Sequence, residues 1–92
     1  MNDLTHHADR RAFRHGIPPL IIQWLLAYGE ERHDQHGGLI RYFSHRSVRR
    51  VMRDVGGQPI RELRKYLGAY AIEGMDTGSV ITVGWRNTRI KS

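Results

Sequence analysis

Residues 18–28, PPLIIQWLLAY, constrain the fold more than any other stretch, because a helix over them would be apolar on nearly all sides. Pro18 and Pro19 suit the first turn of such a helix, and Gly29 predicts its end in a left-handed cap position. A helix without a polar face has to be covered by other elements on most of its sides. We therefore expect this helix in the middle of the fold, with Trp24 in the core. The stretch is far shorter than the roughly 20 apolar residues of a membrane span, so we expect no membrane association.

Two pairs of strand-like segments lie between the other helical patterns, without strand-helix-strand alternation. Apolar periodicity predicts helices over residues 4–15, 18–28, 44–55 and 60–67, and strands over residues 30–34, 38–44, 69–73 and 79–86. Residues 76–78 are typical of a hairpin turn, and residues 87–92 of a frayed tail. This order predicts a single α+β domain over residues 1–92, with an antiparallel sheet of about four strands, two N-terminal helices and a basic helical insert.

Local signals mark the ends of these helices. Thr5 or Asp3 should cap the first helix, and Gly16 should end it. The apolar edge of this helix is narrow and consists of Ala8, Ala12 and Phe13. We therefore expect these three side chains to pack inward.

The helix over residues 44–55, SHRSVRRVMRDV, has two opposed faces. One face is an arginine stripe at positions i, i+3, i+4 and i+7, formed by Arg46, Arg49, Arg50 and Arg53. The other face should pack in the core through Val48, Val51, Met52 and Val55. Like charges one helical turn apart repel each other. A guanidinium group can bind two phosphate oxygens at once. The stripe therefore suits a polyanion, unless acidic residues elsewhere in the fold neutralise it.

The excess positive charge lies in the middle of the chain. The protein has a net charge of +6, and residues 41–65 alone hold eight basic and two acidic residues. Such concentrated charge indicates nucleic acid as the partner, with an anionic membrane surface as the weaker alternative. The chain has no cysteine, which excludes disulfides and thiolate metal sites and fits a reducing cytoplasm.

Two histidines lie beside arginines on expected helices. His7 and Arg11 are one turn apart, and an imidazole beside a guanidinium is a usable pair for phosphate chemistry, although such pairs are also common on solvated helices. His45 begins the arginine helix, where backbone N–H groups favour an anion; the alternative is that Ser44 simply caps this helix and His45 is exposed. The remaining histidines do not match the spacing of a known zinc site, so we expect no metal and no cofactor.

Aromatic residues fall on the expected strands near the basic segment: Tyr42, Phe43, Tyr70 and Trp85. Rings on a sheet with arginines beside them can stack on unpaired RNA bases. Aromatic residues of a sheet more often pack in the core. Both interpretations are open at the level of sequence.

Several short motifs occur in a particular order: His7-Ala8-x-x-Arg11, Gly16-Ile17, Tyr28-Gly29, Tyr42-Phe43 before an arginine-rich helix, Gly68-x-Tyr70, and Val80-Ile81-Thr82-Val83. Together they resemble a widespread bacterial family of small proteins whose hallmark is HAxxR. That family is similar to RelE-type toxins within the small ribonucleases that share the barnase, colicin and RelE core. The resemblance implies a RelE-like sheet with two N-terminal helices, metal-independent RNA cleavage, and roles for His7, Arg11 and Thr82.

We therefore expect a toxin-like endoribonuclease in which a ribose 2′-OH attacks the adjacent phosphorus. His7 or His45 would move the proton, and Arg11, Arg46 and Arg50 would stabilise the phosphorane. The expected RNA-binding residues are Arg41, Arg49, Arg53, Arg64, Tyr42, Thr82, Trp85 and Arg86. One alternative is a non-catalytic module that binds nucleic acid or an acidic partner through the arginine helix. Another is a toxin whose stripe binds an acidic antitoxin tail.

Overall fold

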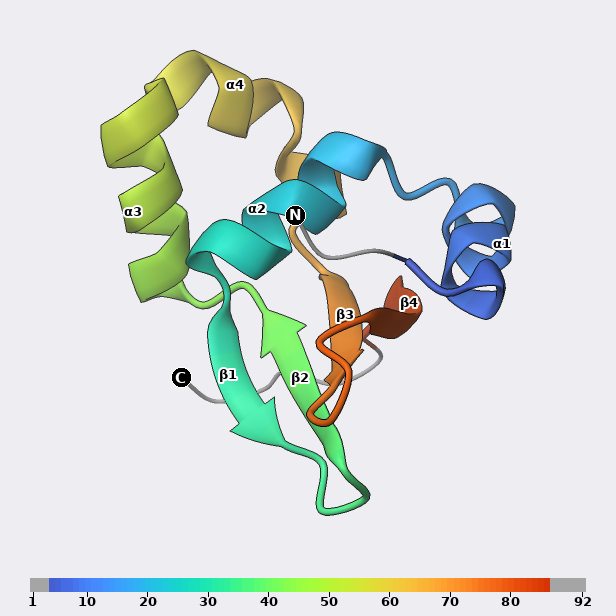
Figure 1. Cartoon of the computed structure of the whole chain (residues 1–92). Helices are drawn as coiled ribbons and strands as arrows, with labels where there is room; N and C mark the ends of the chain where they lie inside the picture. The colour runs from blue at the N-terminus through green and yellow to red at the C-terminus, as the bar shows by residue number, and fades with distance from the viewer. Residues whose placement is uncertain (1–3, 87–92) are drawn as a thin grey trace.

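The computed structural model describes residues 4–86, which build one antiparallel sheet with helices packed on it (Figure 1). The sheet has four strands in the order β1-β2-β3-β4, so each strand pairs with its neighbour in sequence. The elements are α1 (His6–His15), α2 (Pro19–Tyr28), β1 (Glu30–His33), β2 (Gly38–Tyr42), α3 (His45–Val55), α4 (Gly57–Glu62), the 3₁₀ helix η1 (Arg64–Tyr66), β3 (Ala69–Gly74) and β4 (Val80–Trp85). The expected α+β class is confirmed. The expected tail over residues 87–92 and the alternative cap Asp3 lie outside the described residues.

The core lies between α2 and one face of the sheet. Ala71 of β3 pairs with Val83 of β4, and both side chains are fully buried. Ile21 and Leu25 of α2 are equally buried, and Trp24 beside them is a core residue as expected. The sheet covers one side of α2 and α3 covers another (Figure 1), while a third side of the helix is exposed to solvent.

Helix α1 closes the free edge of the sheet beside β4. Leu4 forms a parallel bridge with Val80, and the Thr5 N–H donates to the Val80 carbonyl oxygen at 2.9 Å. Thr5 then caps α1, since its Oγ1 accepts from the Ala8 N–H at 3.2 Å. Gly16 ends the helix with a φ of 66°, in the left-handed region where glycine has no steric penalty. The predicted cap Thr5 and the predicted end at Gly16 are confirmed, but the helix begins at His6 and not at Leu4.

The predicted apolar edge of α1 is wrong at Phe13. Ala8 and Ala12 are buried against the sheet, whereas Phe13 is 92% exposed. Each residue turns a helix by about 100°, so Phe13 points well away from the line through Ala8 and Ala12. Phe13 therefore lies outside the side of α1 that packs against β4.

Helix α3 begins with a capping box in which Ser44 Oγ accepts from the Ser47 N–H and Ser47 Oγ from the Ser44 N–H. Its inward side is narrower than expected. Val51 is fully buried, but Met52 is 42% and Val55 37% exposed, so the prediction that these two pack in the core is wrong. The reason is that α3 packs mainly against α2 and α4, at the outer side of the molecule (Figure 1).

Two further local predictions are wrong. Gly29 is extended, with a φ of −63°, and is not a left-handed cap. A Cβ atom at Gly29 would lie 2.5 Å from the Leu25 carbonyl oxygen and 3.2 Å from that of Tyr42, so close backbone approach explains the glycine. The helix expected over residues 60–67 begins earlier, at Gly57, and breaks at Leu63 before the 3₁₀ turn. Pro59 is tolerated there because the first turn of a helix needs no N–H from it.

The segment between β3 and β4 forms the expected turn, in which the Gly78 N–H donates to the Gly74 carbonyl oxygen at 2.8 Å. Within residues 4–86 no helix is long and apolar enough to cross a membrane.

Candidate nucleic-acid interface

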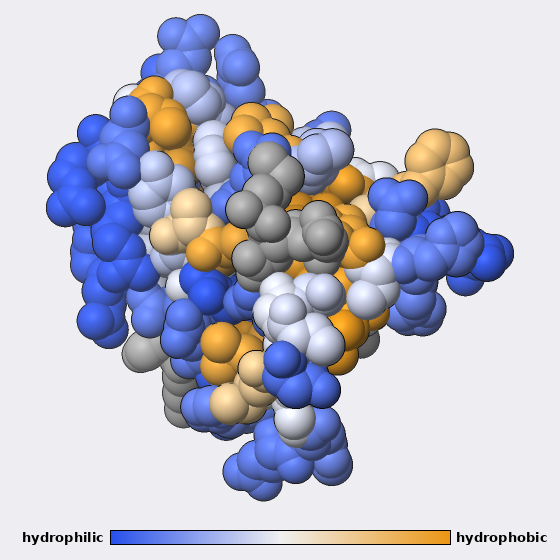
Figure 2. Space-filling model, in the orientation of Figure 1, coloured by the Kyte–Doolittle hydropathy of each residue, from blue (hydrophilic) through white to orange (hydrophobic). Residues whose placement is uncertain are grey.

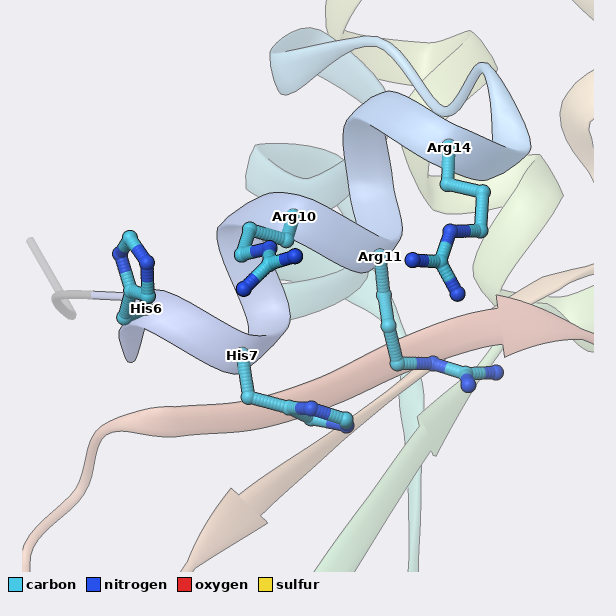
Figure 3. A pocket seen from close by; sticks show the side chains of 5 residues that line it. All are labelled: His6, His7, Arg10, Arg11 and Arg14. Carbon is cyan, nitrogen blue, oxygen red and sulfur yellow. The ribbon is translucent and has the colours of Figure 1, made fainter.

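One side of α1 carries only basic side chains. His6, His7, Arg10, Arg11 and Arg14 line an open pocket of about 310 Å³, and we call these five residues the α1 basic face (Figure 3). They recur at helical spacing, so they project from one side of a ten-residue helix. None of them forms a salt bridge within 4.0 Å in the described part of the chain. The α1 basic face is therefore an unneutralised cationic surface.

Arg11 is held in a fixed position on this surface. Its Nε donates to the Val83 carbonyl oxygen at 2.9 Å, which directs the guanidinium along β4. A Cβ atom at Gly84 would lie 3.2 Å from Arg11 Nη2 and 3.0 Å from Tyr70 Oη, so both groups reach the same point above Gly84. The two terminal nitrogens of Arg11 make no hydrogen bond to any described residue. They remain available to a phosphate in a bidentate geometry.

His7 lies one helical turn before Arg11. Figure 3 shows both side chains reaching over β4 on the same side of α1. The His7 side chain is exposed, so its imidazole can exchange protons with water. A proton carrier and an oriented cation therefore lie beside each other, with the Tyr70 hydroxyl close to the cation.

The arginine stripe of α3 is partly neutralised by residues from outside the helix. Arg50 Nη2 donates to Glu30 Oε1 at 3.1 Å and to the Tyr28 carbonyl oxygen at 2.9 Å. Arg46 Nε lies 3.8 Å from the same Glu30 oxygen. Arg50 therefore links α3 to the last residue of α2 and the first residue of β1, which is a structural role.

Asp54 provides a second acidic contact for the stripe. Arg53 Nε lies 3.7 Å from Asp54 Oδ1, while the Tyr28 hydroxyl donates to Asp54 Oδ2 at 2.7 Å. The Tyr28 bond to this carboxylate raises the pKa of the tyrosine above its ordinary value of 10.0. Arg46, Arg49 and Arg53 still reach solvent, and Figure 2 shows the hydrophilic surface over α3.

The five residues expected to form one catalytic group lie at two distant places. His7 and Arg11 belong to α1, whereas His45, Arg46 and Arg50 belong to α3. Figure 1 shows α1 and α3 at opposite ends of the molecule, with α2 and the sheet between them. These five side chains cannot act on one phosphodiester, so the single-site arrangement is wrong. Of these five residues, Arg46 and Arg50 lie near Glu30, whereas Arg11 of the α1 pair forms no salt bridge within the described residues.

Arg41 is turned inward although it was expected to bind RNA. Its side chain is 11% exposed, and Nη1 lies 2.9 Å from Glu31 Oε1 and 3.3 Å from Glu73 Oε1. Nη2 donates to the carbonyl oxygens of Leu26 at 2.8 Å and Gly29 at 3.3 Å. The guanidinium therefore holds the end of α2 against the sheet.

Tyr42 and Arg86 contact each other instead of solvent. The Arg86 guanidinium lies 5.5 Å from the centre of the Tyr42 ring, and its Nη2 donates to the Phe43 carbonyl oxygen at 3.3 Å. Tyr42 and Phe43 are buried, which places these two aromatic residues in packing. Burial lowers the pKa of Arg86, because the charged form loses hydration.

The other expected RNA-binding residues are scattered. Trp85 Nε1 donates to the His15 carbonyl oxygen at 3.1 Å, and its ring stacks on Tyr66 at 6.2 Å between centres. Thr82 is half-buried in β4 opposite Ile72, and Arg64 is exposed in η1. Of these, Thr82 and Trp85 belong to β4, the strand under Arg11.

Sequence reasoning missed His6, Arg10 and Arg14. Their helical spacing with His7 and Arg11 is visible in the sequence. The net charge counted along the chain, however, indicated residues 41–65 as the binding surface. In the folded protein Glu30 and Glu31 lie beside arginines of residues 41–65, so these two carboxylates do not neutralise α1. Charge balance along the chain is therefore a poor guide to charge balance on the surface.

Within residues 4–86, no group of three or more His, Asp or Glu side chains could hold a metal ion. Comparison of the chain with family models, with curated proteins and with solved structures finds no match.

Proposed function

We propose that this protein is a metal-independent endoribonuclease and that the α1 basic face is its active site. The supporting observation is the geometry of Arg11, whose Nε donates to the Val83 carbonyl oxygen while its terminal nitrogens make no hydrogen bond to any described residue, with His7 on the same side of α1. The motif resemblance to RelE-like toxins supports the same residues, His7 and Arg11. A toxin role in the cytoplasm is part of the proposal.

In this reaction the His7 imidazole takes the proton from a ribose 2′-OH. The 2′ oxygen attacks the adjacent phosphorus, and the bond from phosphorus to the 5′ oxygen breaks. The products are a 2′,3′-cyclic phosphate and a 5′-OH, which takes its proton from water in the open pocket. Arg11 binds the nonbridging oxygens and stabilises the extra negative charge of the phosphorane. Arg10 and Arg14 hold the neighbouring phosphates.

The test is a cleavage assay on end-labelled single-stranded RNA in the presence of EDTA. His7→Ala and Arg11→Ala should each lower the rate by about 100-fold or more, since proton transfer and charge stabilisation each contribute at least that factor. Arg11→Lys should also be slow, because an ammonium cannot reproduce the bidentate contact. The control is Arg46→Ala/Arg49→Ala on α3, which removes two positive charges, one more than Arg11→Ala, from a distant surface.

The control variant should cleave RNA at a rate within about tenfold of the wild-type rate. It should bind RNA more weakly than wild type in the presence of salt. All variants should retain the wild-type circular dichroism spectrum. Cleavage at the wild-type rate in both His7→Ala and Arg11→Ala would disprove the assignment. Loss of cleavage only in the α3 variant would move the site to the arginine stripe.

A second candidate function is a non-catalytic module that binds nucleic acid or an acidic antitoxin-like protein. The exposure of Arg46, Arg49 and Arg53 on α3 favours it. This module would bind RNA without breaking it. Each of these arginines replaced by alanine should then reduce the slope of log affinity against log salt by about 0.7 for a single strand.

A further inference from the structure

Phe13 is a large apolar side chain left almost entirely in water. It is 92% exposed and lies on α1 between Arg10 and Arg14. These residues and Asp9 line an open pocket of about 400 Å³ that adjoins the α1 basic face through the two shared arginines. In Figure 2 the end of the molecule that carries α1 is mainly hydrophilic. An aromatic ring exposed to water lacks the favourable free energy of burial, so a ligand that covers the ring would gain this free energy.

The pocket around Phe13 has one apolar wall, and all its other walls are charged. An apolar side chain of a protein partner would need several apolar walls to bury its surface. A nucleic-acid base needs a single flat apolar face, because its ring stacks while its edge stays polar. The phosphates on either side of that base need cations, and Arg10 and Arg14 line the same pocket as the ring.

We propose that Phe13 stacks on an unpaired RNA base while Arg10 and Arg14 bind the phosphates on either side of it. This inference rests on the proposed function in taking RNA as the ligand, and it adds that the substrate is single-stranded at this position. A base inside a duplex is already stacked on both faces and offers no surface to Phe13. The Asp9 carboxylate in the same pocket can accept a hydrogen bond from an amino or imino group of the base.

The test uses a fluorescently labelled single-stranded RNA with 2′-O-methyl riboses, which lack the attacking hydroxyl and cannot be cleaved by this route. Its affinity is measured by anisotropy with wild type, Phe13→Ala, Phe13→Leu and Phe13→Trp. Removing one base-stacking ring should weaken binding about tenfold, so Phe13→Ala and Phe13→Leu should both show this loss. Phe13→Trp should bind at least as well as wild type. The exposed position means that all these variants should fold.

The control ligand is a duplex of the same sequence, for which all variants should agree with wild type within about twofold. Wild-type affinity of Phe13→Leu would overturn the proposal, because it would show a general apolar contact such as a protein partner makes. An equal loss for the duplex, or no loss for Phe13→Ala, would overturn it as well.

A parallel cleavage assay on unmodified RNA separates this proposal from the function on which it rests. If wild type cleaves RNA and Phe13→Ala binds normally, the stacking role fails and the ribonuclease stands. If wild type binds in a Phe13-dependent way but never cleaves, the ribonuclease fails and the stacking site stands.

Discussion

Replacement of Arg41 by methionine should destabilise the protein by about 3 to 5 kcal/mol, the usual cost of removing one partner from a buried ion pair. The structure explains this magnitude. Arg41 is 11% exposed and contacts Glu73, which is equally buried, at 3.3 Å. It also donates to two carbonyl oxygens at the end of α2, Leu26 at 2.8 Å and Gly29 at 3.3 Å. Each carbonyl that loses its donor inside the protein costs about 1 to 3 kcal/mol unless water reaches it.

Two further variants separate the parts of this interaction. Glu31→Gln removes the exposed ion pair alone and should cost less than about 1 kcal/mol. Arg41→Lys keeps the charge, but one ammonium cannot bind the carboxylate and both carbonyl oxygens, so its loss should be intermediate.

The assay is urea unfolding followed by circular dichroism, with thermal unfolding as a check. For a domain of this size 1 kcal/mol corresponds to roughly 4 to 8 °C, so Arg41→Met should lower the Tm by at least about 12 °C. A loss below about 1 kcal/mol would refute the internal role of this guanidinium. At a temperature where the variant is folded, its RNA affinity should match wild type within about twofold, because the side chain faces inward.

Three other substitutions test local features. Gly84→Ala places a methyl group 3.2 Å from Arg11 Nη2, so RNA cleavage should slow by about tenfold or more while the Tm changes little, and unchanged cleavage would show that Arg11 need not sit above Gly84. Ser44→Ala removes the cap of α3 and should cost about 0.5 to 2 kcal/mol in urea unfolding, and an unchanged free energy of unfolding would mean that the capping box adds no stability. Backbone N–H groups of His36 and Gly38 donate to Asp34 and lower the pKa of its carboxyl below the ordinary 3.8. The charged carboxylate therefore stabilises the fold above pH 3.8, and this stabilisation is lost as the pH falls through the lowered pKa. Asp34→Asn should therefore lower the Tm at pH 7, with a difference that narrows below pH 3.8, and a difference independent of pH would contradict this linkage.

Most secondary structure was predictable because its signals are local. The caps Thr5 and Ser44 and the ending at Gly16 depend on side chains within one turn of each helix end. One failure occurred where distant chain segments meet. Gly29 is extended because the backbone of β2 passes close to it, which no residue near Gly29 reveals.

The candidate site likewise has one part that the sequence predicts and another that only the fold determines. The pairing of His7 with Arg11 on one helix face follows from spacing alone, and the structure places both over β4. The position of Tyr70 beside Arg11 could not be predicted, because it depends on the register of β3 against β4, in which Tyr70 lies opposite Gly84.

The amino-acid sequence by itself determined the helices, the strands, their order and the total charge, because these depend on residue type and short-range spacing. Only the tertiary structure decided which charges remain open to a ligand. Glu30 reaches Arg46 and Arg50 from another element, and Arg41 turns inward, while Arg10, Arg11 and Arg14 form no salt bridge in the described part of the chain. Coulomb interactions depend on distance in space, and folding rearranges those distances independently of position along the chain.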